Sequence, residues 1–506
     1  MGTPTTIRDL IGAGAALGAS ALGAPGRSDL SYAQLTRLIE ETRARLRRVG
    51  GGPTSRVALV LPNGPELAAA VLAVAAGAAA APLNPAYRRA EFEFFLDDLE
   101  ADALIVEQGS TSPAIDAARA RGMTVLELRA MSAAPAGAFT LEGATPEPAG
   151  ATAEPTGEDI ALLLHTSGTT ARPKLVPLRQ KNLTASARHI AATLRLTPED
   201  RCLNIMPLFH IHGLIGALLA SLAAGASVSC APGFNALKFF SWLEAVRPSW
   251  YSAVPTMHQA ILARAQRNRP SGEGLRLVRS SSASLAPATL ADLEALFACP
   301  VIESYGMTEA AHQMTSNPLP PGRRKPGSVG LPAGPEVAIM DDANRLLEPG
   351  AIGEVVIRGP NVMTGYARNP EANAEAFTHG WFRTGDQGAF DADGCLTLTG
   401  RLKEIINRGG EKIAPKEVDE ILAGHPAVAQ AVAFAVPHPK LGQDIAAAVV
   451  LRKRGSADER ALRDFAAERL AAFKVPRRIL ILERLPTGAT GKVQRAALAK
   501  TLGLDG

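Results

Sequence analysis

The alternation of short apolar runs with helical segments most constrains what this chain can fold into. Residues 30–48 carry apolar side chains at close to helical spacing, and Ser31 is suited to cap that helix. Short apolar runs typical of buried strands follow at 56–63, 104–108, 124–128 and 160–164. Strands that alternate with helices predict an α/β fold, in which helices cover both faces of a mainly parallel sheet.

The pattern changes twice further along the chain. From about residue 326 it becomes β-rich and punctuated by glycine, which predicts the hairpins of a smaller β subdomain. After Gly400 the remaining residues have α+β character. The sequence therefore predicts a large N-terminal domain, residues 1–399, and a small C-terminal domain, residues 404–506.

Two local patterns allow sharper predictions. The Ala-rich segment 65–84 is interpreted as one helix that ends in a turn at its proline. Ser456, with Glu459 three residues later, predicts a capping box at the start of a helix over 456–473.

Composition excludes several classes of function. The 506 residues include 53 basic and 49 acidic side chains, and the net charge of +4 predicts no nucleic-acid partner. The apolar run Leu67–Pro82 is too short and too rich in Ala to span a membrane. The four cysteines stand far apart, so neither a disulfide framework nor a zinc site is expected. Since the N-terminus lacks a signal-peptide pattern, we expect a cytoplasmic protein.

The strongest chemical signal is the segment HTSGTTARPK, residues 165–174, which follows a buried strand. Gly168 lets the backbone approach a ligand closely, and Lys174 adds a positive charge. Donor groups come from Thr166, Ser167, Thr169 and Thr170. Such a loop is suited to hold phosphate oxygens, although its spacing is not that of a Walker A loop. Taken alone, the segment is equally compatible with a flexible polar turn.

Four further motifs follow in order: YGMTE (305–309), WFRTGD (381–386), GRLKE (400–404) and PTGATGKVQR (486–495). The first motif comes directly after a predicted strand, where open α/β sheets bind ligands. There Tyr305 can stack on a base, Thr308 can donate to phosphate and Glu309 can hold a metal ion. In the other three motifs, Asp386 supplies a carboxylate for ribose hydroxyls, Arg401 supplies a forked guanidinium and Lys492 supplies an ammonium group.

Together, these motifs resemble those of the adenylate-forming superfamily of acyl-CoA synthetases, adenylation domains and beetle luciferases, over nearly the whole chain. The resemblance implies a C-terminal domain that moves about a hinge at 400–403, with Lys403 at the hinge position. It also implies ATP, Mg²⁺ and CoA as ligands, and a monomer or homodimer with no membrane span. Ala171, Leu175 and Ser281 depart from the usual pattern, which often has Gly at these places.

The resemblance assigns a role to each motif. The loop Thr166–Lys174 handles the β- and γ-phosphates, and Tyr305 packs on adenine. Thr308 and Glu309 would serve the α-phosphate and Mg²⁺. Asp386 and Arg401 would bind ribose, and Lys492 would be the catalytic lysine. The segment 408–415, with Gly409 and Gly410, matches the loop that enters the thioester-forming site.

The acid pocket of this family is lined by three segments, which here read MPLFHIHGL (206–214), RSSSASLA (279–286) and EAAHQMTSNPLP (309–320). They supply the predicted acid-binding residues His210, His212, Ser282 and His312, of which His210 is also a catalytic candidate. Three imidazoles and a hydroxyl suit a small, doubly charged acid better than a fatty acid. Two of the histidines could instead be structural.

These segments look most like those of oxalate–CoA ligases, which implies oxalate as the acid. Malonyl-CoA synthetases share several features but carry an Arg before YGMTE, where this chain has Ser304. Medium-chain acids stay open if the histidines do not line the pocket. A carrier-loading adenylation enzyme and an inactive nucleotide-binding scaffold are the further alternatives.

Overall fold

The computed structural model describes residues 4–13, 16, 18–48, 51–143, 153–166, 173–265, 274–487 and 493–505. The chain forms two compact units. The first consists of Met1–Val337 and Ile357–Phe382, and the second of Ala338–Val356 and Arg383–Gly506. The hinge at 400–403 and the domain bounds beside it stay predictions.

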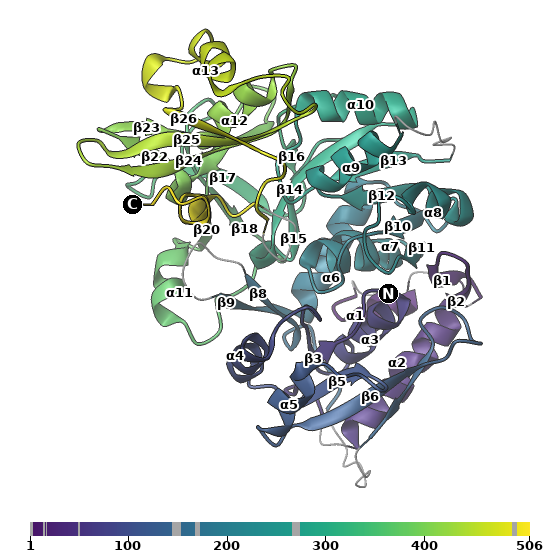
Figure 1. The fold of residues 1–506 in the computed structure, drawn as a ribbon. Helices are drawn as coiled ribbons and strands as arrows, with labels where there is room; N and C mark the ends of the chain where they lie inside the picture. The colour runs from purple at the N-terminus through teal and green to yellow at the C-terminus, as the bar shows by residue number, and fades with distance from the viewer. Residues whose placement is uncertain are drawn as a thin grey trace. The chain divides into compact units, whose positions relative to one another are not determined.

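The first unit is built on two mainly parallel sheets (Figure 1). In the described residues, the larger sheet orders its strands as β16 (Leu331–Pro332), β15 (His312–Ser316), β14 (Val301–Met307), β13 (Leu277–Ser280), β12 (Trp250–Ala253), β10 (Arg201–Asn204), β11 (Ser227–Cys230), β1 (Ser20–Ala24) and β2 (Arg27–Ser31). The smaller sheet orders β7 (Phe139–Glu142), β6 (Thr124–Ala130), β5 (Ala103–Glu107), β3 (Arg56–Val60), β4 (Ala79–Pro82), β8 (Ile160–Thr166) and β9 (Lys174–Arg179). Among the described strands of these two sheets, antiparallel neighbours occur toward the edges alone, at β2, β15, β16, β7 and β9. The predicted α/β fold is confirmed.

Helices cover both faces of the larger sheet. The helices α8 (Phe239–Val246), α9 (Pro255–Ala265) and α10 (Pro287–Phe297) bury their apolar side chains against one face. The π-helix η1 (His212–Leu219) contacts β10, β12 and β15, and it packs on α6 (Gln180–Thr193) and α7 (Ala220–Ala223). A π-helix is rare, and such turns occur frequently at functional sites.

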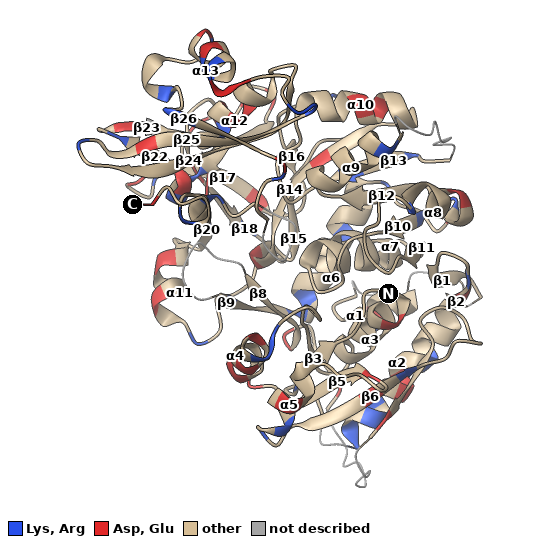
Figure 2. Ribbon diagram, in the orientation of Figure 1, with Lys and Arg blue, Asp and Glu red and all other residues tan. Residues whose placement is uncertain are grey.

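The smaller sheet is covered in the same way. Apolar faces of α4 (Arg89–Leu99) and α5 (Pro113–Arg119) pack on it, while α3 (Pro65–Ala75) contacts β4 of this sheet and β1 of the larger one. The remaining helices of this unit are α1 (Ile7–Ala13), α2 (Tyr32–Arg47), the 3₁₀ turn η2 (Thr308–Ala310) and α11 (Pro370–Ala376), with the short strand β19 (Phe377–Thr378) after α11. Figure 2 shows residues of both charges on α2.

The helix predicted over 30–48 is confirmed as α2. Ser31 caps it through a hydrogen bond that its side chain accepts from the Gln34 backbone, and the Gln34 side chain completes the capping box. Leu35 and Ile39 are fully buried. Helical spacing therefore identified both the element and its core face.

Two local predictions were wrong. The segment 65–84 is not one helix, because α3 ends at Ala75 and the residues Ala79–Pro82 form strand β4. Ala favours helices, but β4 lies buried between β3 and β8, and tertiary packing outweighs so weak a preference. The helix predicted over 456–473 is shorter, α13 (Glu459–Ala467), and its cap is Asp458 rather than Ser456, whose hydroxyl donates to the Lys453 carbonyl.

The second unit contains most of β17 (Glu336–Met340), β18 (Gly353–Arg358) and β20 (Trp381–Phe390), and all of β21 (Leu396–Arg401). Its C-terminal sheet orders β23 (Glu411–Ile413), β22 (Ile406–Arg408), β25 (Gly442–Leu451) and β24 (Val428–His438), with β26 (Arg478–Leu482) parallel to β25. The helices α12 (Pro415–Ala423) and α13 pack on this sheet. Short turns complete it: η3 (Leu402–Glu404), η4 (Ala472–Lys474), η5 (Arg495–Ala497) and α14 (Leu498–Thr501). Among the described residues, no helix combines the length and apolar character that a membrane crossing needs.

Candidate active site

The predicted phosphate loop joins two antiparallel strands of the smaller sheet. Thr166, the last residue of β8, pairs with Lys174, the first residue of β9, and the Thr166 hydroxyl lies 3.5 Å from the Lys174 carbonyl oxygen. The other predicted phosphate ligands, Ser167, Gly168, Thr169 and Thr170, lie outside the described residues. The described part of this motif is therefore the base of a hairpin that ends in a cation.

A chain of contacts links this cation to the motif YGMTE. The Lys174 ammonium lies 4.5 Å from the centre of the Tyr366 ring, and the Tyr366 hydroxyl donates to Glu309 Oε1 at 2.9 Å. Thr308 and Glu309 form the turn η2 directly after β14, which carries Tyr305 near its end. The structure thus brings together Lys174 and Glu309, which sequence analysis placed in separate motifs. Tyr366 was missed, because a single Tyr after a Gly gives no chemical signal in the sequence.

Glu309 is the residue that the sequence predicts to hold a metal ion. Its side chain is buried, with 6% of the residue exposed. No group of three or more His, Cys, Asp or Glu that could hold a metal occurs among the described residues. A single carboxylate still fits Mg²⁺, which proteins bind through one or two carboxylates while phosphates and water complete its coordination.

Three of the four predicted acid-binding residues lie together beyond the carboxyl ends of β10 and β13. The His212 and His312 rings are stacked, with centroids 4.9 Å apart and an interplanar angle of 26°. His212 Nδ1 lies 3.1 Å from the Ser282 hydroxyl, and its Nε2 lies 2.6 Å from the hydroxyl of Ser252, which sequence analysis missed. Both imidazoles are buried, whereas Ser282 is half-buried. His210 lies two residues before this cluster, with its ring 5.1 Å from that of Phe209.

The backbone at this cluster adopts an uncommon conformation. Ser282 has φ of 71° and His312 has φ of 103°, in the region that side-chain-bearing residues seldom occupy. Such conformations cost on the order of 1–3 kcal/mol each and concentrate at functional sites. The geometry of Ser282 and His312 is therefore held by the surrounding fold.

A guanidinium that sequence analysis missed lies beside His312. Arg279, in β13, is fully buried, and its Nη1 lies 3.0 Å from His312 Nε2. Its Nη2 donates to Gln313 Oε1 at 3.1 Å. Burial lowers the pKa of Arg279 to about 9, so the side chain keeps its charge at neutral pH. An arginine within a strand sequence looks like an outward-facing residue, but here Arg279 contacts Gly216 of η1 and His312 and Gln313 of β15.

Two glycines make room for this arrangement. A Cβ on Gly216, in η1, would lie 2.5 Å from His312 Nε2 and 3.0 Å from Arg279 Nη1. A Cβ on Gly306 would lie 1.9 Å from the His312 carbonyl oxygen. Both positions therefore exclude any larger residue unless His312 moves.

The second unit pairs the two predicted ribose ligands. Asp386 in β20 is opposite Arg401 in β21, and Arg401 Nε lies 3.0 Å from Asp386 Oδ1. Gly409 and Gly410 form the turn between β22 and β23 with φ of 63° and 101°, values that favour glycine. Lys403 is exposed in η3, and Lys492 lies outside the described residues.

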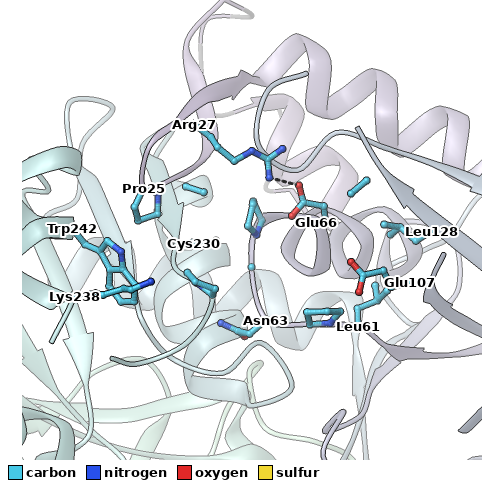
Figure 3. Close-up of a pocket in the computed structure, with 16 residues that line it drawn as sticks. Pro25, Arg27, Leu61, Asn63, Glu66, Glu107, Leu128, Cys230, Lys238 and Trp242 are labelled. Carbon is cyan, nitrogen blue, oxygen red and sulfur yellow. Dashed lines mark hydrogen bonds and ion pairs between the residues drawn. The ribbon is translucent and has the colours of Figure 1, made fainter. Parts of the chain in front are cut away.

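A separate cavity of about 370 Å³ lies in the first unit, near the carboxyl ends of β1, β3, β5 and β11 (Figure 3). Its walls include Asn63, Lys238 and Trp242, together with an ion pair between Arg27 and Glu66 at 2.6 Å. None of the predicted site residues lines it. The candidate active site is therefore the region of η1, β13, β15 and η2.

Comparison with known proteins gives consistent matches along the whole chain. The family model of AMP-binding enzymes matches residues 15–367, and that of the AMP-binding enzyme C-terminal domain matches residues 417–492. The chain is 46% identical over 490 residues to the oxalate–CoA ligase of Arabidopsis thaliana, covering 95% of each protein. It is 48% identical over 488 residues to a protein named Probable CoA ligase CCL9 of Humulus lupulus, covering 94% of this chain and 92% of that protein. The crystal structure of ATP-bound MatB from Rhodopseudomonas palustris matches with a TM-score of 0.88 at 30% sequence identity, covering 98% of each chain.

Proposed function

Because this chain belongs to the AMP-binding enzyme family and is an acid–CoA ligase, we propose that its acid substrate is oxalate. The proposed reaction converts oxalate, ATP and CoA to oxalyl-CoA, AMP and diphosphate through an acyl-adenylate. The observation that carries the proposal is the stacked pair of buried imidazoles, His212 and His312, beside the half-buried hydroxyl of Ser282. The identity of 46% to an oxalate–CoA ligase supports the same acid.

Polarity of the pocket favours a short acid with two carboxylates. A fatty-acid pocket needs a deep apolar wall, whereas this cluster presents hydroxyl and imidazole groups. Hydrogen bonds from such groups to an ionised carboxylate are stronger than neutral ones. Oxalate has only two carbons, so its second carboxylate stays close to the reacting one and needs donors there.

The chemistry requires the carboxylate to be activated. Attack of a carboxylate oxygen on the α-phosphorus of ATP gives an acyl-adenylate, in which AMP is a good leaving group, and the CoA thiol then displaces AMP. Negative charge grows on the phosphates during the first step, and preorganised cations stabilise such charge. Lys174 and the predicted catalytic residue Lys492 are the cations proposed for this role, with Thr308 as a donor to the α-phosphate.

Mg²⁺ is proposed to be held by Glu309 and, when bound, would supply positive charge beside the phosphates. Tyr366 keeps the Glu309 carboxylate oriented through its hydroxyl hydrogen bond. Asp386 and Arg401 are proposed to contact ribose, and Tyr305 to pack on adenine. Thioester formation is assigned to the segment with Gly409 and Gly410.

Malonate is the second candidate acid. Ser304 stands where malonyl-CoA synthetases carry an Arg. Its hydroxyl lies 3.4 Å from the Ser280 carbonyl oxygen, so this hydroxyl is hydrogen-bonded within the sheet. The deciding experiment measures AMP release with CoA for oxalate, malonate and octanoate. We expect the highest catalytic efficiency with oxalate, lower efficiency with malonate and negligible release with octanoate. A preference for octanoate would contradict the assignment of both the acid and the pocket.

A further inference from the structure

Arg279 is a buried cation for which the described residues provide no carboxylate. Its guanidinium contacts the Gly216 carbonyl at 3.4 Å, His312 Nε2 at 3.0 Å and Gln313 Oε1 at 3.1 Å. All three partners are uncharged acceptors, and Nε is buried with no hydrogen-bond partner in the described structure. Burying a charge without a counter-charge costs free energy, so Arg279 is not explained by its contribution to the stability of the fold.

The contact with His312 fixes the state of that imidazole. A guanidinium has hydrogen-bond donors and no acceptor, so the contact between Arg279 Nη1 and His312 Nε2 requires Nε2 to accept. The ring hydrogen must then lie on Nδ1, and His312 is held as a neutral donor. Nδ1 lies on the Gly306 side of the ring, 3.1 Å from the point where a Cβ on Gly306 would be. The donor thus lies beside the motif that begins at Tyr305.

We propose that Arg279 is a positioning residue that makes the acid site selective for a substrate with a second negative charge. It holds the His312 ring as a donor toward the distal acid group of the substrate and supplies the opposing charge behind it. The substrate anion then acts as the counter-ion that the described residues do not provide. The proposal rests on the proposed function, because it places the acid at the cluster of His212, Ser282 and His312.

Charge selectivity is the measurable consequence. A substrate that lacks the second charge, such as acetate, gains nothing from Arg279 beyond its structural contacts. Oxalate gains a charge-assisted hydrogen bond and the attraction of a cation in a water-poor site, where electrostatic interactions are strong. The ratio of catalytic efficiencies for oxalate and acetate therefore reports on Arg279, and changes that damage both reactions equally cancel in it.

The experiment measures this ratio by ATP–pyrophosphate exchange in the wild type, Arg279→Met and Arg279→Lys, with malonate as a second dianion. We expect the ratio to fall about a hundredfold in Arg279→Met, mainly through the KM for oxalate, with the KM for ATP little changed. Arg279→Lys keeps the charge but loses the fork that reaches Gln313, so we expect it to retain part of the selectivity. Arg276→Met is the matched control, because Arg276 precedes the same strand and pairs with Asp200. It should lower stability and leave the ratio unchanged.

Gly216→Ala tests the same geometry without changing any charge. The new methyl group would displace the His312 ring from Arg279, since the Cβ would lie 2.5 Å from Nε2. We expect the ratio for oxalate over acetate to fall here too, by at least tenfold. Should Arg279→Met prove too unstable to assay, this variant decides the question, and an unchanged ratio in it would overturn the proposal.

The outcomes separate this inference from the proposed function. If the wild type prefers malonate to oxalate and Arg279→Met loses malonate selectively, the role of Arg279 is supported while oxalate is wrong. Equal losses for oxalate and acetate in Arg279→Met would overturn the role of Arg279 and leave oxalate in place. A wild type that prefers octanoate would overturn both.

Discussion

Arg279 in the first unit, which is fully buried, and Arg495 in the second unit, whose side chain is 19% exposed, have opposite surroundings. Arg495, in the second unit, has Asp419 at 2.7 Å and Glu404 at 3.0 Å. Burial alone would lower the pKa of Arg495, but these carboxylates outweigh it and raise the pKa above its ordinary value. Among the described residues, Arg279 of the first unit contacts neutral acceptors alone, and burial lowers its pKa to about 9.

The difference separates a structural from a functional charge. The fold supplies Arg495 with its counter-ions, so this side chain ties η5 to η3 and α12 within the second unit. Arg279 has no counter-ion in the part of the chain that the structure describes, and it lies beside two stacked imidazoles and residues with positive φ. A buried charge whose compensation is missing from the fold is the kind of group that an anionic ligand can complete.

The largest expected effect is the loss of Arg495. Arg495→Met leaves Asp419 and Glu404 without their cation; breaking a buried ion pair typically costs about 3–5 kcal/mol, which is the upper limit for these partly buried groups. Hydrogen exchange should show reduced protection of β24 and β25, since Arg495 also donates to the Ala433 carbonyl. Arg460→Met, at a side chain that is 90% exposed, is the control and should leave protection unchanged. If β24 and β25 were as well protected in Arg495→Met as in Arg460→Met, Arg495 would have no structural role.

Lys492, three residues before Arg495, is expected to act on chemistry instead of folding. Lys492→Ala should lower ATP–pyrophosphate exchange by about 10²–10³, the usual cost of removing one preorganised group that stabilises the transition state. The melting temperature should barely change, in contrast to Arg495→Met. Exchange close to the wild-type rate would exclude Lys492 from catalysis.

His312→Ala tests the other end of the Arg279 contact. It should remove a charge-assisted hydrogen bond to oxalate worth about 1.5–3 kcal/mol, which is tenfold to over a hundredfold in catalytic efficiency. ATP affinity should be little changed. In a double-mutant cycle, His312→Ala should cost much less when Arg279 is already Met, because the two residues act as one unit. Additive losses would show that each acts separately.

The smallest expected effect is that of Arg279→Met on stability. Arg279→Met removes the penalty for burying a charge, and this gain offsets the loss of the hydrogen bonds that Arg279 donates to Gly216, His312 and Gln313. We expect the free energy of unfolding of the first unit to stay within about 1 kcal/mol of the wild type. A loss of the size expected for Arg495→Met would show that Arg279, like Arg495, is a structural residue.

The alternation of strands and helices was enough to predict the parallel sheets, because its periodicity reflects burial along each element. It failed where packing outweighs local preference. In the run 65–84, alanines in α3 and β4 have the same local preference, and only the pairing of β4 with β3 and β8 separates them. A single sequence records residue preference but not which strand a segment will pair with.

The residues of the candidate site were likewise predicted only in part. The motifs identified Lys174, Glu309, His212, Ser282 and His312, because their side chains carry recognisable chemistry, and the structure brings these residues into two groups of contacts. It was not possible to predict the residues that hold them in place. Tyr366, Arg279 and Gly216 act through contacts with partners 33 or more residues away in the chain, and no single motif holds both members of such a contact.

A crystal structure with a stable analogue of oxalyl-adenylate would show directly which residues bind the distal carboxylate. We expect the distal carboxylate of the analogue to accept a hydrogen bond from His312 Nδ1, with Arg279 still donating to Nε2 of the same ring. A distal carboxylate bound elsewhere, with the cluster of His212, Ser282 and His312 left out of contact, would contradict the central claim that this cluster selects the acid by its second charge.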